Sequence, residues 1–220
     1  MGELSKFFGL AFSALLPLVN PLGTALVFLS LVGSAPQAVY RALARRIAIS
    51  TTIFLISIEA GGTLLLKFFG ISLPVVQVSG GLALAAMGWK LLNQEEPGQK
   101  ATPADDLGLR SLEEKVFYPF TFPITAGPGC IVVMVTLSAH ATGRGLLPSL
   151  TAHAGIVIAV VLLSVAVYFC YGHAPTLTAR ISPQSAHGLL RLVAFVLLCI
   201  GVQITLNGVE TIVKTMLLKT

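Results

Sequence analysis

Long stretches without a charged side chain constrain this chain more than any other feature of its sequence. Five windows of 18 to 35 residues contain no Asp, Glu, Lys or Arg, and a sixth of 20 residues is interrupted by Glu59 alone. The windows are 7–40, 47–66, 68–89, 116–143, 145–179 and 192–209. Each is long enough, or nearly so, for a helix to cross a hydrocarbon layer about 30 Å thick. Charged residues make up only 10% of the chain, against about 25% in soluble domains, so we expect an all-α polytopic membrane protein.

The windows predict six transmembrane helices, which place both chain termini on the same side of the membrane. The expected helices are roughly 7–33, 45–68, 72–93, 116–140, 147–172 and 188–213. Five Lys and Arg residues fall on the side of the termini and nine on the opposite side. Because cationic loops stay in the cytoplasm, we expect both termini on the outer, periplasmic side. Topology then explains the net charge of +5, and no nucleic-acid partner is expected.

The chain is expected to form one membrane domain built from two halves. Residues 94–115 hold six of the nine acids together with Pro97, Gly98 and Pro103, which is typical of a solvated cytoplasmic linker. The halves are then 1–93 and 116–220, with three spans each. Because three is odd, the second half enters the membrane from the opposite side, which predicts an inverted 3+3 repeat of the kind found in transporters.

Proline and glycine recur at matched places in the first span of each half. Pro17, Pro21 and Gly23 occupy the first half, while Pro123, Gly127, Pro128 and Gly129 occupy the second. Proline removes an amide donor and clashes with the preceding turn, and glycine permits unusual backbone angles. We therefore expect an unwound segment at mid-membrane in each half, buried in protein or lining a polar cavity. Helix starts there suit a carboxylate and helix ends suit an ammonium or another cation, so two facing breaks would suit a zwitterion. Kinks that serve packing alone are the alternative.

A few polar side chains lie inside the apolar windows. Asn20 could bind substrate or satisfy carbonyls freed by Pro21, and Thr24, Thr121 and Thr125 could line a cavity or bond their own backbone. Glu59 is the only acid inside a span and is a candidate for proton coupling, unless it reaches water at the outer interface. The four histidines and three cysteines lack metal-ligand spacing, so neither a metal nor another cofactor is expected.

Five segments resemble the MarC family of six-span inner-membrane proteins, some of which are called SnatA and which belong to the LysE exporter superfamily. They are NPLGTALVF (20–28), FFGISLP (68–74), GGLALAAMGWKLL (80–92), FPITAGPGCI (122–131) and LNG (206–208). The resemblance implies outward-facing termini and transport of small neutral amino acids such as glycine and alanine. It also implies which residues form the breaks: Asn20, Pro21 and Gly23 in the first, and Thr125, Ala126, Gly127, Pro128 and Gly129 in the second. Glu59 departs from the family pattern.

The leading hypothesis is a secondary transporter that exports small neutral amino acids by alternating access around the two breaks, coupled to H⁺ or Na⁺. The alternative is a passive small-solute channel with aquaporin-like half-helices. Such channels need an Asn in both halves, and in this chain Gly127 occupies the position of the second half that corresponds to Asn20. The chain contains neither HExxH nor Gly-x-Ser-x-Gly, so an enzyme is not expected. Whether the protein forms a homo-oligomer stays open.

Overall fold

The computed structural model describes residues 2–93, 109–142, 145–180 and 183–218, and all regular structure in them is helical. The elements are α1 (Glu3–Val19), α2 (Pro21–Val32), α3 (Gln37–Phe68), α4 (Leu73–Leu92), α5 (Leu109–Glu114), the π-helical segment η1 (Val116–Thr125), α6 (Pro128–Ala141), α7 (Leu146–Gly172), α8 (Ala174–Arg180) and α9 (Pro183–Leu217). The all-α class predicted from the sequence is confirmed. Of the expected linker 94–115, residues 94–108 lie outside the described residues, and 109–114 form α5.

Four helical segments are long and apolar enough to cross a membrane: Glu3–Val32, Gln37–Phe68, Leu146–Gly172 and Ala194–Leu217. A fifth crossing is added if η1 and α6, which meet at an angle of 71°, are counted as one broken span. The 20-residue helix α4 coincides with the third expected span but is not among the four. The count of six spans and the inverted repeat therefore stay predictions.

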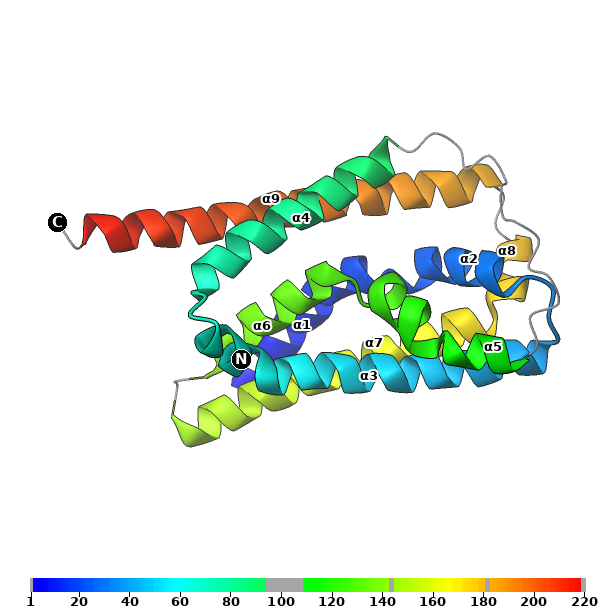
Figure 1. Cartoon of the computed structure of the whole chain (residues 1–220), viewed down its shortest axis with the longest axis horizontal. Coiled ribbons are helices and arrows are strands. Elements are labelled where there is room, and N and C mark those ends of the chain that lie inside the picture. The colour runs from blue at the N-terminus through cyan, green and yellow to red at the C-terminus, as the bar shows by residue number, and fades with distance from the viewer. Residues whose placement is uncertain (1, 94–108, 143–144, 181–182, 219–220) are drawn as a thin grey trace.

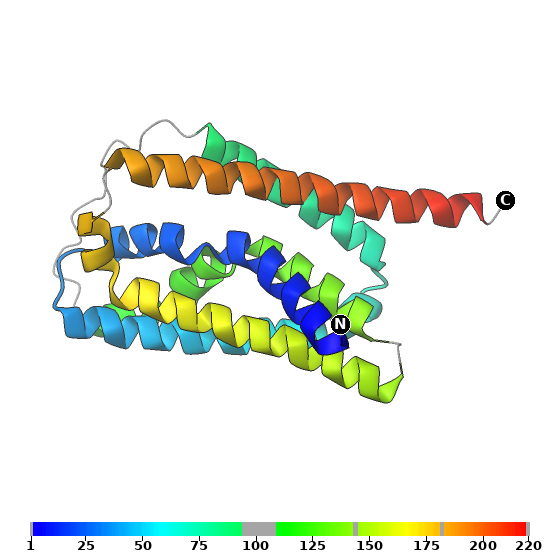
Figure 2. The ribbon, with the colours of Figure 1, turned by 180° about the vertical axis from the view of Figure 1, so that it is seen from behind.

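The helices form a bundle with α4 and α9 lying side by side along one face, as both views of the ribbon show (Figure 1, Figure 2). The rest of the bundle is held together by α7, which packs against α1 and α3, and by α6, which contacts α1, α3 and α4. Many large apolar side chains remain exposed, among them Leu64, Phe68 and Leu146. Such a surface is suited to lipid contact, since monomeric soluble proteins rarely expose large apolar patches.

Glycine allows α4 and α9 to approach closely. A Cβ added to Gly81 would lie 2.6 Å from the Thr205 backbone nitrogen, and one added to Gly88 would lie 2.6 Å from the Leu198 nitrogen. These distances are too short for any real Cβ, so only glycine fits at this crossing. Close approach at small residues is how membrane helices gain van der Waals contact when the surrounding lipid is as apolar as the helices.

Candidate functional site

The first break is a single residue between α1 and α2. Asn20 has φ 42° and ψ 65°, in the left-handed region, so α1 ends at Val19 and α2 begins at Pro21. The Asn20 side-chain oxygen accepts a hydrogen bond of 3.1 Å from the Gly23 amide, which makes it the N-cap of α2. A Cβ on Gly23 would overlap the Asn20 side chain. Asn20 was expected to bind substrate or to satisfy carbonyls freed by Pro21, and in the structure its side-chain oxygen instead accepts from an amide.

This break is shorter than the unwound segment expected from the sequence. Pro17 lies inside α1, and α1 and α2 together still qualify as one 30-residue membrane span. The physical reason is the capping by Asn20, which lets the helix restart after one residue. The Thr24 hydroxyl lies within hydrogen-bond distance of the carbonyls of Val19 (3.2 Å) and Asn20 (2.9 Å), where it satisfies groups left over at the break.

The second break is larger and contains two tandem copies of an aromatic-Pro-x-Thr tetrapeptide. Its copies are Tyr118–Thr121 and Phe122–Thr125, and the first residue of each copy has non-helical backbone angles. Each threonine hydroxyl donates to the carbonyl five residues earlier. Thr121 reaches Val116 at 2.8 Å and Thr125 reaches Phe120 at 2.7 Å. The threonine hydroxyls therefore add side-chain hydrogen bonds to the backbone of this irregular segment.

The chain leaves helical geometry again at Ala126 (φ −125°, ψ 87°) and Gly127 (φ −77°, ψ 179°), and α6 then starts at Pro128. No side chain caps α6, because its N-cap residue is Gly127. In this respect the two breaks differ, since α2 is capped by Asn20. The start of α6 thus combines an uncapped helix N-terminus with the positive end of the helix dipole. Gly129, in the first turn of α6, packs closely against Leu84 and Leu18.

Tyr171, near the end of α7, joins the two breaks. Its hydroxyl lies 2.8 Å from the Thr125 hydroxyl and close to Thr24, whose own hydroxyl bonds the carbonyls of Val19 and Asn20. Leu18, in the last turn of α1, lies beside Gly129. The two breaks, more than 100 residues apart in the sequence, are therefore neighbours in space, as the sequence analysis expected of facing breaks.

An aromatic cluster fixes the position of Tyr171. The ring of Phe28 stacks on Tyr171 with centroids 4.6 Å apart, and it meets Phe120 and Tyr40 edge-on at 5.3 Å and 5.8 Å. All four rings are fully buried. Sequence reasoning did not find Tyr171, and the sequence carries no local signal for it, since one tyrosine near the end of an apolar span is typical of an interface anchor.

The space between the breaks is closed in this conformation. Thr125, Ala126 and Tyr171 are 0% exposed, while Asn20 and Thr24 are half-buried. Pro21, Gly23 and Gly129 are also buried, Gly127 is partly exposed, and Pro128 is exposed. The contacts around Tyr171 thus bury the hydroxyls of Thr125 and Tyr171, whereas the start of α6 at Pro128 is exposed.

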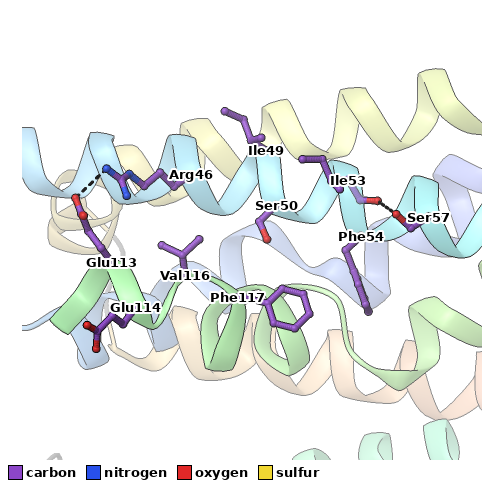
Figure 3. Close-up of a pocket in the computed structure, with 10 residues that line it drawn as sticks. All are labelled: Arg46, Ile49, Ser50, Ile53, Phe54, Ser57, Glu113, Glu114, Val116 and Phe117. Atoms are coloured by element: carbon purple, nitrogen blue, oxygen red, sulfur yellow. Dashed lines mark hydrogen bonds and ion pairs between the residues drawn. The ribbon is translucent and has the colours of Figure 1, made fainter. Parts of the chain in front are cut away.

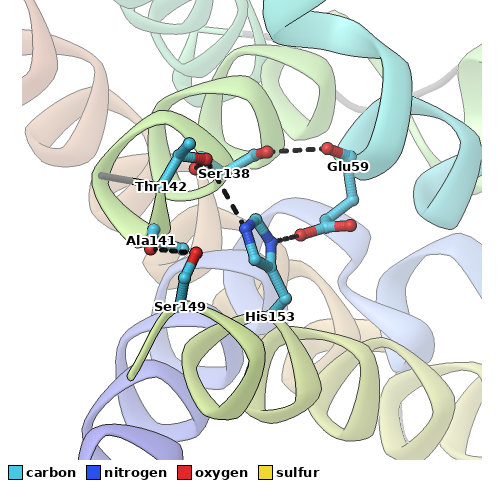
Figure 4. A network of polar contacts seen from close by, with 6 residues as sticks. All are labelled: Glu59, Ser138, Ala141, Thr142, Ser149 and His153. Atoms are coloured by element: carbon cyan, nitrogen blue, oxygen red, sulfur yellow. Dashed lines mark hydrogen bonds and ion pairs between the residues drawn. The ribbon is translucent and has the colours of Figure 1, made fainter. Parts of the chain in front are cut away.

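Glu59 lies elsewhere, where α3, α6 and α7 meet. Its side chain is buried and forms a hydrogen-bonded ion pair with His153 of α7 (Figure 4). Glu59 was expected to act without a named partner, and His153 was considered only as one of four histidines that lack metal-ligand spacing. A signal for the pairing existed, because Glu59 is nine residues before the end of α3 and His153 is seven residues after the start of α7. Those two helix ends lie at the same end of the bundle (Figure 1).

A groove of about 620 Å³ lies between α3 and the segment formed by α5 and η1 (Figure 3). Its walls are mainly apolar, and the ion pair between Arg46 and Glu113 (3.0 Å) lies at one end. Phe54 of α3 lies in the groove and contacts Phe117 and Phe122 of η1. The groove therefore borders the irregular segment that leads to the second break. In the part of the chain that the structure describes, no three His, Cys, Asp or Glu side chains come together to form a metal site.

Comparison with known proteins gives a consistent result. Residues 5–213 match the model of the MarC family of integral membrane proteins. The chain is 32% identical over 225 residues to the UPF0056 inner membrane protein MarC of Citrobacter koseri, and 28% identical over 219 residues to that of Salmonella typhimurium. Both alignments cover 98% of this chain and 99% of the relative. No solved structure matches.

Proposed function

Because the chain belongs to the MarC family of integral membrane proteins, we propose that it is a secondary transporter of small neutral amino acids of the glycine and alanine class. Solute would cross by alternating access around the two helix breaks, in the direction of export, with both termini on the periplasmic side of the inner membrane. The observation that carries the proposal is the position of Tyr171 between the breaks. Its hydroxyl lies 2.8 Å from that of Thr125 in the second break, and its ring stacks on Phe28 of α2, the helix that follows the first break, with centroids 4.6 Å apart.

The two breaks offer different groups to the two ends of a zwitterion. The start of α6 has no side-chain cap and presents the Gly129 amide and the positive end of a helix dipole, which suit the carboxylate. Pro128 has no amide hydrogen, and the Cys130 amide bonds the Gly127 carbonyl at 3.0 Å. The last turn of α1 presents carbonyls, of which that of Pro17 cannot pair with residue 21 because Pro21 has no amide hydrogen. Such carbonyls suit the ammonium group. A zwitterion between them would complete hydrogen bonding that the breaks leave unfinished.

The surroundings of the breaks favour a small, neutral solute. The residues that bring the breaks together are uncharged: Leu18, Thr24, Thr125, Gly129 and Tyr171. A charged side chain on the solute would therefore meet no counter-charge among them. Their close packing disfavours a large side chain and favours hydrogen or methyl. This supports glycine and alanine over larger or ionised amino acids.

Transport by purified protein in proteoliposomes tests the proposal. Labelled glycine or alanine should equilibrate by saturable counterflow against unlabelled amino acid inside, and lysine or glutamate should compete poorly. Counterflow distinguishes a carrier from the alternative, a passive channel, because a channel gives a flux that rises linearly with concentration and shows no exchange. The burial of Thr125 and Tyr171 favours the carrier, since an open pore needs a continuous water-filled path.

A matched pair of variants tests the site. Thr125→Val removes the hydroxyl that contacts Tyr171 at nearly constant shape, and we expect it to weaken glycine exchange. Thr211→Val on α9, whose exposed hydroxyl bonds only its own helix, is the control and should exchange like the parent protein. Equal exchange by the two variants would remove the second break from the mechanism.

A further inference from the structure

The contact between Glu59 and His153 is unusual for a membrane protein, because it buries an ionisable pair between two apolar helices. The Glu59 side chain is only 8% exposed, and that of His153 is 28% exposed. An acid inside the membrane is costly and is rarely retained without a function. Apolar side chains of similar size could hold α3 and α7 together at no such cost. A role beyond helix packing would explain why the chain keeps this pair.

The polar groups around the imidazole are placed to accept hydrogen bonds from it. Nδ1 faces a Glu59 carboxylate oxygen, and Nε2 lies 3.5 Å from the Thr142 hydroxyl oxygen. The Thr142 hydroxyl donates its own hydrogen to the Ser138 carbonyl at 2.9 Å, so its oxygen is left to accept. Both ring nitrogens thus face acceptors, which is the arrangement that suits an imidazolium beside a carboxylate.

We propose that Glu59 and His153 form the proton-coupling site of this transporter, an inference that rests on the transport function proposed above. The resting pair is neutral, with the carboxylate on Glu59 and the proton on His153. Release of one proton to water leaves the carboxylate beside a neutral imidazole, and uptake of one proton restores the neutral pair. Imidazole changes charge near neutral pH, and the partly exposed ring of His153 is the part of the pair that water can reach.

Helix α6 connects this pair to the second break. Ser138 donates a hydrogen bond of 2.7 Å to the backbone carbonyl of Glu59, and Thr142 at the end of α6 contacts His153. The break lies at the other end of the same helix, before Pro128. Ten residues separate Pro128 from Ser138, about 15 Å along the helix axis. A movement of α6 at the break would therefore shift both polar contacts of the pair, and a change of protonation would act on the break in return.

The Glu59 carboxylate contacts His153, and the other titratable groups described at this end of the bundle lie on α6, α3 and α1. On α6, the Nδ1 of His140 lies 2.7 Å from the Thr136 carbonyl. Lys67 of α3 lies eight residues beyond Glu59. Helix α1 packs against α7 beside Gly155, and Glu3 and Lys6 lie at its start. A pH effect that disappears with Glu59 and with His153 would thus be assigned to the pair.

Two flux measurements on the same proteoliposomes test the proposal. Glycine counterflow needs no net proton movement, whereas accumulation against a gradient needs coupling to the imposed pH difference. We expect Glu59→Gln and His153→Gln to retain counterflow within about twofold and to lose gradient-driven accumulation. Glu210→Gln is the matched control, because Glu210 also pairs with a cation, Lys214 at 2.5 Å, but on the exposed surface of α9. This control should keep both activities.

Accumulation by Glu59→Gln at the level of the parent protein would overturn the proposal. Loss of counterflow in both variants would overturn it too, because the pair would then be needed for the structure rather than for coupling. Absence of counterflow in the parent protein would instead refute the proposed function. Infrared difference spectra of purified protein between about pH 5 and pH 8 test the pair without substrate. Imidazole bands should change with pH, and the part of this change that belongs to His153 should be missing in His153→Gln and present in Glu210→Gln, while the other three histidines contribute alike to all three proteins. Spectra that are identical for the parent and His153→Gln would contradict the proposal.

Discussion

Replacement of Asn20 separates the two physical effects that make the first break. Asn20→Ala removes the side-chain cap, a hydrogen bond of 3.1 Å from the Gly23 amide to Asn20. It also puts alanine at φ 42°, in the left-handed region that alanine disfavours. Loss of an N-cap costs about 1 kcal/mol, and the left-handed conformation costs about 1 kcal/mol more. Asn20→Gly loses the cap but adopts this φ freely, so it should cost only about 0.5 kcal/mol.

Thermal unfolding in detergent measures the difference. For a chain of this size, 1 kcal/mol shifts the Tm by roughly 2–4 °C, so Asn20→Ala should lower the Tm by about 4–8 °C and Asn20→Gly by about 1–2 °C. The buried thiol of Cys130 reports unfolding through a thiol-reactive dye, once Cys170 and the exposed Cys199 have been replaced by Ser. Asn207→Ala, at an exposed position on α9, is the control and should leave the Tm within 1–2 °C of the parent.

Equal destabilisation by alanine and glycine would refute this reasoning, because it would mean that the backbone conformation at Asn20 contributes nothing. A Tm unchanged by Asn20→Ala would refute it as well, because the cap would then be absent. An outcome in which Asn20→Gly is the less stable of the two would contradict the left-handed geometry of the break itself.

Three further predictions follow from the packing and the topology. Tyr171→Phe should cost about 1 kcal/mol of stability through the lost hydroxyl contact with Thr125 and should slow glycine counterflow; unchanged exchange kinetics would show that Tyr171 does not link the breaks. Gly62→Ala should destabilise the protein by about 1–3 kcal/mol, because the new Cβ would lie 2.6 Å from the Val135 side chain. Gly61→Ala is the control and should not destabilise it, because nothing lies within 4 Å of a Cβ there. Melting in detergent compares the two, and a lower Tm for Gly61→Ala than for Gly62→Ala would contradict the packing of α3 on α6. Reporter fusions at the two chain ends should both be active only in the periplasm, and a cytoplasmic signal from either would overturn the orientation inferred from nine cations against five.

Much of the helical framework could be predicted from the charge-free windows alone. Expected and observed boundaries agree within one residue for α4 and α7 and at the end of α3. The expected start of this helix, residue 45, was wrong by eight residues, because the span was begun at the Arg45–Arg46 pair and Arg41 was left outside it. In the structure α3 begins at Gln37 and carries these arginines on its first turns, since a helix continues beyond the membrane wherever its backbone remains hydrogen-bonded.

The positions of both breaks followed from local chemistry, but their shapes did not. Pro21 and the Pro128 region end one helix and start another, as expected from the properties of proline. The sequence could not indicate that Asn20 confines the first break to one residue, because this depends on a side chain folding back onto Gly23. Gly129, expected to bind substrate, packs against Leu84 and Leu18, so a bulky replacement there would disturb helix packing as well as any binding.

The side chains that connect distant segments lie beyond local pattern reasoning. Tyr171 with Thr125, and His153 with Glu59, are 46 and 94 residues apart, and no periodicity or motif couples them. Their pairing depends on how α7 packs against the rest of the bundle. The one available signal was the similar distance of Glu59 from the end of α3 and of His153 from the start of α7. This signal is informative only once it is known that these two helix ends lie at the same end of the bundle.

An experimental structure determined in a lipid nanodisc with a saturating concentration of glycine would test the central claim most directly. We expect density for one small zwitterion between the end of α1 and the start of α6. Its carboxylate should lie on the amides that follow Gly127, and the molecule should lie within hydrogen-bond distance of Thr24, Thr125 or Tyr171. Density for glycine at another place, or an empty site between the breaks together with saturable glycine exchange by the same preparation, would contradict it.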